Sequence, residues 1–334
     1  LEVFYSRLRP FYWSLVLFVL SALVVTALWI APRSRLLAGA AWTSVLIPTL
    51  LVIAGITLRC IIRGRPPVTT LYETTLFIPA VAVVVALITE WINRRRIAMS
   101  VAAAIGCIGL FLAHNYELRG PDTMESMIAV LDSNFWLSTH VTTVTIGYSA
   151  GLLAAVLAHV YIFGQALGLG ARHRDFFRSI ARMTYGVICF GTLFAFVGTV
   201  LGGIWANNSW GRFWGWDPKE NGALLIILWF LFILHARLGG YVRDMGIAVC
   251  SIIGGMIVAF SWWGVNLLAV GLHSYGFIDG VQRSLTAFYL TQIAVLAVAG
   301  YAWVMRRRAG EAGAQASGRS ARGGLAGSQP QTGA

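Results

Sequence analysis

Charged residues are scarce in this chain of 334 residues, because Asp, Glu, Lys and Arg together make up only 11% of it. A soluble domain has about a quarter of its residues charged. Hydrophobic residues reach 58%, and the mean hydropathy is +0.74. The shortage of charge excludes a soluble fold and predicts a protein that lies mostly within a lipid bilayer.

Cysteine is also scarce, and its spacing excludes two classes of function. Each of the four cysteines lies in or at the edge of an apolar run, at Cys60, Cys107, Cys189 and Cys250. None belongs to a C-x-x-C or C-x-x-C-H motif, so the chain is neither a thiol oxidoreductase nor itself a c-type cytochrome. We interpret the four as small buried apolar residues.

Acidic residues are too few to balance the arginines, and the net charge is +12. The basic residues form short clusters between apolar runs rather than a continuous stripe, so nucleic acid is not predicted as a partner. Clusters of this kind mark the cytoplasmic side of a membrane protein. They lie at residues 94–96, 172–182, 237–243 and 306–308.

Long apolar runs recur along the whole chain. A hydrocarbon core about 30 Å thick is crossed by a helix of about 20 residues, whose backbone hydrogen bonds are satisfied internally. We therefore predict an all-α polytopic membrane protein with about nine transmembrane helices. The expected spans are 11–31, 42–62, 74–91, 97–113, 138–166, 184–203, 221–238, 246–267 and 284–304.

The arginine clusters predict how these parts are oriented. Alternation from the clusters places residues 1–10 and the loops 114–137, 204–220 and 268–283 on the outer side. Residues 11–305 then form the transmembrane domain, and the Gly-, Ala-, Ser- and Gln-rich residues 306–334 predict a disordered cytoplasmic tail. Because the chain begins with Leu1 rather than Met, we expect a processed product or a segment of a longer protein.

One segment, residues 204–220, is unusually rich in tryptophan: Trp205, Trp210, Trp214 and Trp216. Aromatic faces with interleaved glycines predict a flat apolar platform for a large planar ligand. Arg212 and Lys219 are candidates to pair with ligand carboxylates such as haem propionates. The alternative is an interfacial aromatic belt, although belts scatter single aromatics over many helix ends.

Two carboxylates close this segment, Asp217 and Glu220. Both precede a predicted helix, where a carboxylate is favoured by the positive end of the helix dipole. They anchor the loop through its own backbone amides or act at the edge of the ligand, and the sequence leaves both interpretations open. Glu73, near another helix start, has the same two interpretations.

Residues 210–220 resemble the tryptophan-rich "WWD" signature of the haem-handling superfamily of cytochrome c biogenesis. The chain is most similar to the CcsA/ResC type of the system II pathway. Segments 66–73, 235–237 and 271–277 also resemble that type, and the resemblance covers residues 60–305. It implies haem b as a transported ligand, and it implies a bacterial inner membrane, or a thylakoid membrane in a plastid. The implied partners are apocytochrome c, a companion membrane subunit of the CcsB/ResB type and, indirectly, thiol-reducing proteins.

Two histidines are predicted to lie on the same side as the tryptophans. His140 follows the 114–137 loop, and His273 lies in the last outer loop. Neutral imidazole is a good axial ligand of haem iron. We therefore predict an outer haem site with His140 and His273 as axial ligands, and the resemblance implies histidines that flank the tryptophan segment in this way.

A third candidate ligand, His235, lies about 21 Å along the helix that follows the tryptophan segment, near the inner side. The resemblance implies a transmembrane histidine that receives haem there, with a second ligand from an N-terminal region or a companion subunit. No such companion histidine is recognised in this chain. His159 is an internal candidate, with a packed side chain as its alternative, whereas His114 and His173 are interpreted as structural or solvated.

Together with the resemblance, these residues predict haem transport to the outer face and covalent attachment to the C-x-x-C-H motif of apocytochrome c. This is holocytochrome c synthase activity, exerted alone or with a partner subunit. No nucleophile–base pair is recognised, so no acid–base residue is predicted. Three alternatives remain: a haem exporter that hands haem to a chaperone, a b-type electron-transfer cytochrome, and a transporter of another hydrophobic ligand.

Overall fold

The computed structural model describes residues 1–119, 123–124, 132–268, 270–271, 273 and 281–326. Within these residues it contains nine helices that are long and apolar enough to cross a membrane, and no strand. The predicted fold class, an all-α multi-pass membrane protein, is confirmed. Parts of the predicted outer loops 114–137 and 268–283 lie outside the described residues.

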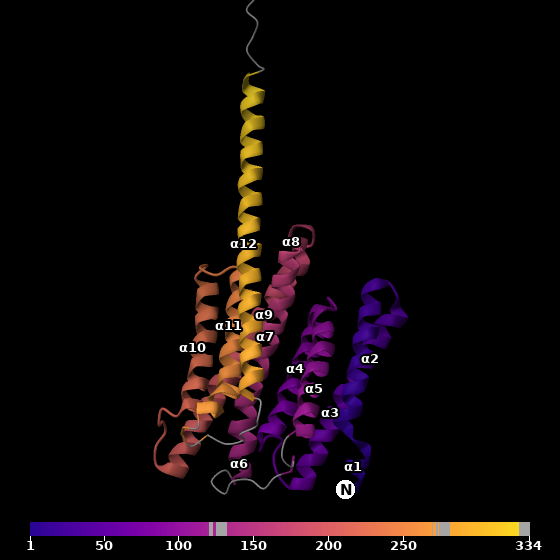
Figure 1. The fold of residues 1–334 in the computed structure, drawn as a ribbon, viewed down its shortest axis with the longest axis vertical. Coiled ribbons are helices and arrows are strands. Elements are labelled where there is room, and N and C mark those ends of the chain that lie inside the picture. Colours follow the sequence, from indigo (N-terminus) through magenta and orange to yellow (C-terminus); the bar gives the residue numbers. More distant parts are fainter. Residues whose placement is uncertain (120–122, 125–131, 269, 272, 274–280, 327–334) are drawn as a thin grey trace, which may run out of the picture.

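The helices follow one another along the chain, most of them with short connections (Figure 1). Their bounds are α1 (Glu2–Leu8), α2 (Pro10–Ile30), α3 (Arg35–Arg63), α4 (Leu71–Asn93), α5 (Ile97–Arg119), α6 (Asn134–Trp136), α7 (Thr142–Ala166), α8 (Leu169–Arg172), α9 (Arg174–Trp210), α10 (Pro218–Leu238), α11 (Asp244–Trp262) and α12 (Val281–Ala326). A π-helical turn, η2 (Leu137–Val141), joins α6 to α7, and a 3-10 turn, η3 (Gly264–Leu268), follows α11.

The long helices form two packed groups. One contains α2 to α5, and the other contains α7 and α9 to α12; contacts between α4 and α7 join them. The central helix is α7, because 67% of its most apolar window is buried inside the protein, against 22% for α12. The exterior carries exposed apolar side chains such as Leu193, Leu228 and Phe232, as expected where lipid replaces water.

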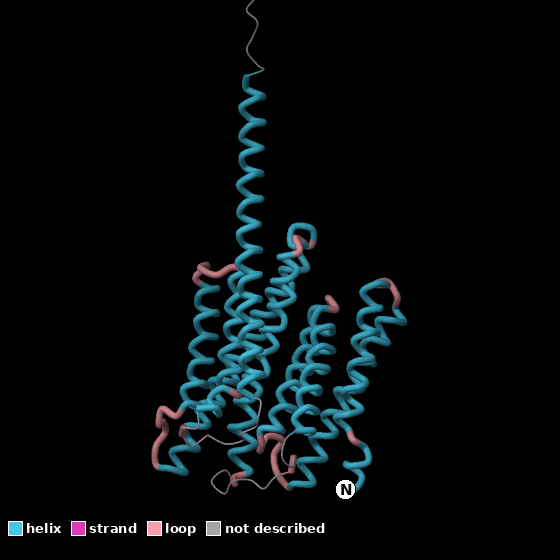
Figure 2. Tube along the Cα trace, in the orientation of Figure 1, coloured by secondary structure: helices cyan, strands magenta, loops and turns pink. Residues whose placement is uncertain are grey.

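The bundle has two chemically different ends (Figures 1 and 2). The tryptophan end holds the N-terminus, the corner 64–70, α6 and the segment 211–217. The arginine end holds the corners between α2 and α3, α4 and α5, α7 and α9, and α10 and α11. The relative placement of these segments agrees with the predicted alternation, while the assignment of each end to a side of the membrane stays a prediction.

Small residues bring α7 and α9 into close contact. They recur on α9 at spacings of three and four, at Gly191, Ala195, Gly198 and Gly202. A Cβ added at Gly198 would lie 2.6 Å from the backbone nitrogen of Val144 on α7, so only glycine permits this approach. Small residues of this kind are typical of tightly packed membrane helices, and here they fix the register of α7 against α9.

The tryptophan segment differs from its predicted bounds. Helix α9 continues to Trp210 and ends at Gly211, whose φ of 70° gives the left-handed cap that glycine favours. Trp205 and Trp210 therefore lie on the last turns of a helix, and the loop is restricted to residues 211–217. Asn207, Asn208 and Ser209 are typical turn residues, but here they remain helical because the left-handed glycine cap follows them.

The end of the chain also differs from its prediction. Helix α12 continues past the apolar span to Ala326, where a disordered tail was predicted from residue 306 onward. Extending an existing helix is much easier than nucleating one, and Ala, Arg, Glu and Gln are good helix formers. The Gly content that predicted disorder is offset by these residues.

Candidate functional site

A cavity of about 140 Å³ lies at the tryptophan end, between the starts of α4, α7 and α10 and the ends of α9 and α11. Seven of the residues singled out from the sequence line it: His140, Trp205, Trp210, Trp214, Lys219, Glu220 and His273. These residues come from four separate segments of the chain. The fold therefore brings together both predicted outer histidines and three of the four tryptophans of residues 204–220.

His140 is held by a short hydrogen bond. It lies in the π-helical turn η2, a feature that is frequent at functional sites. Its Nδ1 lies 2.7 Å from the carbonyl oxygen of Gly198 on α9. A carbonyl only accepts, so Nδ1 carries the proton and Nε2 keeps its lone pair for a metal.

Glycine also makes room for the His140 ring. A Cβ added at Gly202 would lie 2.5 Å from Cε1 of His140. The same small-residue face of α9 therefore sets the position of the ring and supplies its hydrogen-bond acceptor. The ring contacts Trp205 at 5.8 Å between centroids, and Trp205 is stacked on Trp136 at 6.4 Å with an interplanar angle of 11°. Trp136 was not singled out from the sequence.

His273 lies beside a buried carboxylate. Its Nδ1 is 3.2 Å from Oδ1 of Asp217, and its ring contacts Trp210 edge-on at 6.2 Å. Gly271 has a φ of +88°, and a Cβ there would overlap the Asp217 carboxylate, so this segment can approach Asp217 only with glycine at 271. A carboxylate next to Nδ1 favours the tautomer whose Nε2 is free to bind a metal.

The two carboxylates of the segment cap α10. The side chain of Asp217 accepts from the backbone N–H of Lys219 and forms a capping box with Glu220. Oε2 of Glu220 accepts from the N–H groups of Gly215 and Asp217, at 2.8 and 3.2 Å. The anchoring role that the sequence left open is therefore present for both.

Trp216 does not line the cavity. It has a φ of 58° and is 70% exposed. A bulky residue in the left-handed region is unusual. In this conformation Glu220 accepts hydrogen bonds from the backbone N–H groups of Gly215 and Asp217, the residues on either side of Trp216.

The two side chains predicted to pair with ligand carboxylates, Lys219 and Arg212, have different surroundings. Lys219 lines the cavity, and its Nζ donates to the carbonyl oxygen of Trp262 at the end of α11, at 2.9 Å. Arg212 lies 3.6 Å from Oε1 of Glu220, and its guanidinium lies 5.8 Å from the centre of the Trp210 ring. Lys219 is the cation within the cavity, whereas the charge of Arg212 is balanced inside the segment.

The remaining histidines lie outside this cavity. His235 is exposed in the last turn of α10, at the arginine end, with Nδ1 2.7 Å from the carbonyl oxygen of Leu231. His159 on α7 makes the same contact with Ala155, also at 2.7 Å. In both, the helix backbone accepts from Nδ1 and leaves Nε2 available. His114 lies 3.7 Å from Glu117, and His173 precedes α9 and is exposed.

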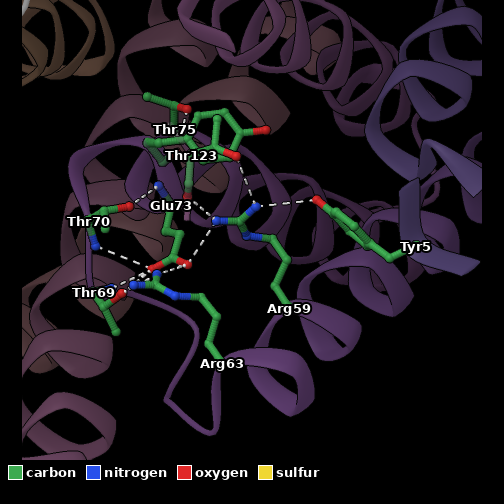
Figure 3. Close-up of polar contacts among 9 residues, drawn as sticks. Tyr5, Arg59, Arg63, Thr69, Thr70, Glu73, Thr75 and Thr123 are labelled. Carbon is green, nitrogen blue, oxygen red and sulfur yellow. Dashed lines mark hydrogen bonds and ion pairs between the residues drawn. The ribbon is translucent and has the colours of Figure 1, made fainter. Parts of the chain in front are cut away.

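A buried ion cluster supports the wall of the cavity at the corner between α3 and α4 (Figure 3). Glu73 is contacted by Arg59 at 3.2 Å and by Arg63 at 2.7 Å. Its other oxygen accepts from Thr69, and Thr70 caps α4. Both threonines line the cavity. Arg59 was missed from the sequence, although a charge inside an apolar run is a signal for function.

The same corner holds the segment that leads to His140. Arg65 donates to Asp132 at 2.7 Å, and Asn134 donates to the carbonyl oxygen of Gly64 at 3.1 Å. The hydrogen bond from Arg65 lowers the pKa of Asp132. These contacts connect the α3–α4 corner to α6, which leads directly into the turn of His140.

Comparison with known proteins assigns the chain to a protein family. The family model described as "Cytochrome C assembly protein" matches residues 68–273. The chain belongs to this family. Every described residue that lines the cavity falls within the matched segment, which begins at the α3–α4 corner and ends at His273.

Similar family members occur in cyanobacteria and in plastids. A protein of Synechococcus sp. (strain CC9605) named cytochrome c biogenesis protein CcsA is 30% identical over 291 residues, covering 78% of this chain and 94% of that protein. The protein of the same name from Chlamydomonas reinhardtii is 29% identical over 238 residues, covering 70% and 67% of the two chains. The recognition of the CcsA type from the sequence is confirmed.

A solved structure shares the fold. It is that of a cytochrome c heme lyase, CcmF, with a TM-score of 0.58 and 13% sequence identity. The match covers 87% of this chain and 50% of that one, so this chain spans half the length of that protein. At this identity the likeness concerns the fold alone.

Proposed function

We propose that this protein delivers haem b to the tryptophan end and holds it there for covalent attachment to the C-x-x-C-H motif of apocytochrome c. One observation supports this above all. His140 and His273, 133 positions apart in the sequence, line one aromatic cavity, and each has its Nδ1 at a backbone or carboxylate oxygen. Two imidazoles with free Nε2 atoms suit the two axial positions of haem iron.

The surroundings suit a porphyrin. Trp205, Trp210 and Trp214 offer apolar faces, and the ammonium group of Lys219 is placed for a propionate. Sites for ligands of this size usually have volumes of about 300–1,000 Å³, larger than the 140 Å³ of this cavity. Haem entry therefore requires this cavity to widen.

Covalent attachment requires this chain mainly to position the haem and the peptide. Each motif cysteine adds its S–H across a vinyl C=C bond of haem, which forms a C–S and a C–H bond with no leaving group and no net electron transfer. Oriented reactants reach effective molarities of about 10⁵ M or more. A haem whose iron is fixed by His140 and His273 presents its vinyl groups in one place to the incoming peptide.

The arginine end is the proposed inner side. There His235 is exposed on the outside of α10, where a neighbouring subunit can reach its Nε2. We propose that haem first binds at His235 with a second ligand from a companion of the CcsB/ResB type. Thiol-reducing proteins keep the motif cysteines reduced. The tryptophan end then faces the outer side of the bacterial inner membrane, or the equivalent side of a thylakoid membrane.

The test uses the purified chain, with and without its companion subunit, supplied with reduced haem and a C-x-x-C-H peptide. We expect a covalent haem–peptide product, and we expect His140→Ala or His273→Ala to lower haem retention and product at least about tenfold. Added imidazole should partly restore haem retention in both variants. His114→Ala is the matched control, because His114 lies at the same end but outside the cavity.

The outcomes separate the alternatives. Haem bound without a covalent product would favour the exporter. Wild-type haem content and product in both His140→Ala and His273→Ala would contradict the site itself. Failure of any preparation to take up haem would favour a transporter of another hydrophobic ligand.

A further inference from the structure

A second cavity, of about 570 Å³, lies at the arginine end. It is formed by the end of α7, by α8, by the starts of α9 and α11, and by α12. Its polar and charged lining residues are Tyr161, Gln165, Arg174, Arg178, Asp244 and Arg306. None of these residues has a role in the proposed delivery or attachment of haem.

The charge of this cavity is positive. Three arginines from two helices face one carboxylate, Asp244, and that carboxylate is already held at 2.9 Å by Arg237, which is outside the lining. Arg178 lies 3.9 Å from Asp175, but both side chains are well exposed, so this pair balances little charge. Guanidinium groups that converge from separate helices are well suited to an anion with several oxygens.

A buried amide points to a ligand independently of this charge. Gln165 is 5% exposed and lines the cavity, and its Oε1 has no hydrogen-bond partner among the described residues. A Cβ at Gly170 would overlap the amide, so the turn of α8 closes directly over Gln165. A buried polar atom without a partner is costly. Since the amide can turn over, it can offer either N–H or C=O to a bound polar group.

The depth of the cavity identifies the kind of anion. Arg174 and Asp244 begin apolar spans, and Arg306 lies at the end of the span Val281–Arg308. The cavity therefore lies where the hydrocarbon core ends and lipid headgroups begin. The exposed Trp303, three residues before Arg306, is typical of this level. Among the described residues, the lining contains no histidine, methionine or cysteine that would bind haem iron.

We propose that this cavity binds the phosphate headgroup of an anionic phospholipid. Arg174, Arg178 and Arg306 contact the phosphate, and Gln165 contacts a further headgroup oxygen. Basic cavities between transmembrane helices are suited to such headgroups. The lipid then links α12, which is the least buried of the nine spans, to α9 and α7.

The test compares lipid retention by the full chain in nanodiscs of phosphatidylcholine with and without phosphatidylglycerol, counted by native mass spectrometry. The cavity variant is Arg174→Gln/Arg178→Gln/Arg306→Gln. The matched control, Arg33→Gln/Arg94→Gln/Arg95→Gln, removes the same charge from exposed corners at the same end. We expect wild type and control to retain phosphatidylglycerol and the cavity variant to bind it more than about tenfold more weakly.

A second variant and a competitor complete the design. Gln165→Leu changes no charge, and it should also weaken retention, which keeps the proposal testable if the triple variant does not fold. Equal losses in the cavity variant and the control would show general attraction to charge and overturn the site, as would unchanged retention in both cavity variants. Displacement of the lipid by millimolar inorganic phosphate would make the site one for free phosphate instead.

Discussion

The two ends of this bundle differ in how the charged side chains around their cavities are paired. At the tryptophan end, the cavity has a volume of about 140 Å³, and the carboxylates around it, Glu73, Asp217 and Glu220, are each bonded to neighbouring groups. At the arginine end, the cavity has a volume of about 570 Å³ and exposed arginines at its rim. An aromatic cavity with fixed polar groups suits the planar ligand proposed for the tryptophan end, whereas a larger basic cavity suits the anionic headgroup proposed for the arginine end.

The difference arises from the helices that carry each end. The tryptophan end is built on the tight contact of α7 with α9, where glycines set the position of His140. At the arginine end, α12 packs mainly against α7 and α11, and of the α12 side chains that the structure describes only Arg306 reaches the cavity. Close helix packing therefore accompanies the proposed iron site, and a less buried helix accompanies the proposed lipid site.

The largest loss of stability is expected from breaking the ion cluster of the tryptophan end. Glu73→Gln leaves Arg59 and Arg63 buried without their carboxylate, and removing one partner of a buried pair costs about 3–5 kcal/mol. The thermal midpoint in detergent should fall and haem retention should decrease, while phosphatidylglycerol retention at the arginine end should persist in the folded fraction.

Glu117→Gln is the control for that change, because Glu117 lies at the same end with an exposed side chain. Thermal midpoints that are equal in the two variants would contradict a supporting role for the cluster. If Glu73→Gln lost lipid retention together with haem retention, the two ends would not be independent.

A smaller and more local effect is expected at Gly202. In Gly202→Ala the added Cβ overlaps the His140 ring, and overpacking of this kind costs about 1–3 kcal/mol. Haem affinity should fall roughly tenfold to a hundredfold, as measured by titration of the purified chain. Gly186→Ala on the same helix is the control, since nothing lies within 4 Å of a Cβ there. Equal affinities in both variants would mean that α9 does not position His140.

The smallest effect is expected at the surface pair of Arg65 and Asp132. The pKa of Asp132 is lowered by Arg65, so its contribution to stability is present above the unfolded pKa of about 4 and is lost as the pH falls through the lower folded value. Asp132→Asn should therefore lower the thermal midpoint slightly at pH 7. The difference from wild type should shrink as the pH falls below about 4, and a difference that stayed constant with falling pH would contradict the ion-pair explanation.

The spans were predictable from the sequence because they depend on local composition. Runs of about 20 apolar residues have few alternatives to transmembrane helices, and the nine spans were located to within a few residues at most ends. The larger errors were at both ends of α9, which begins at Arg174 rather than at residue 184 and ends at Trp210 rather than at residue 203, and after residue 306, where α12 continues. Helix ends depend on capping and on propagation from a stable helix, which composition reflects poorly.

The sequence by itself determined that this chain crosses a membrane several times and which residues are candidates to bind haem. Only the tertiary structure decided which of these candidates lie in one place. It brings His140 and His273 to one cavity, turns Trp216 outward, leaves His235 exposed and places Arg59 on Glu73. The physical reason is that hydropathy sets the depth of a residue in the membrane, whereas the face it presents depends on how closely neighbouring helices pack.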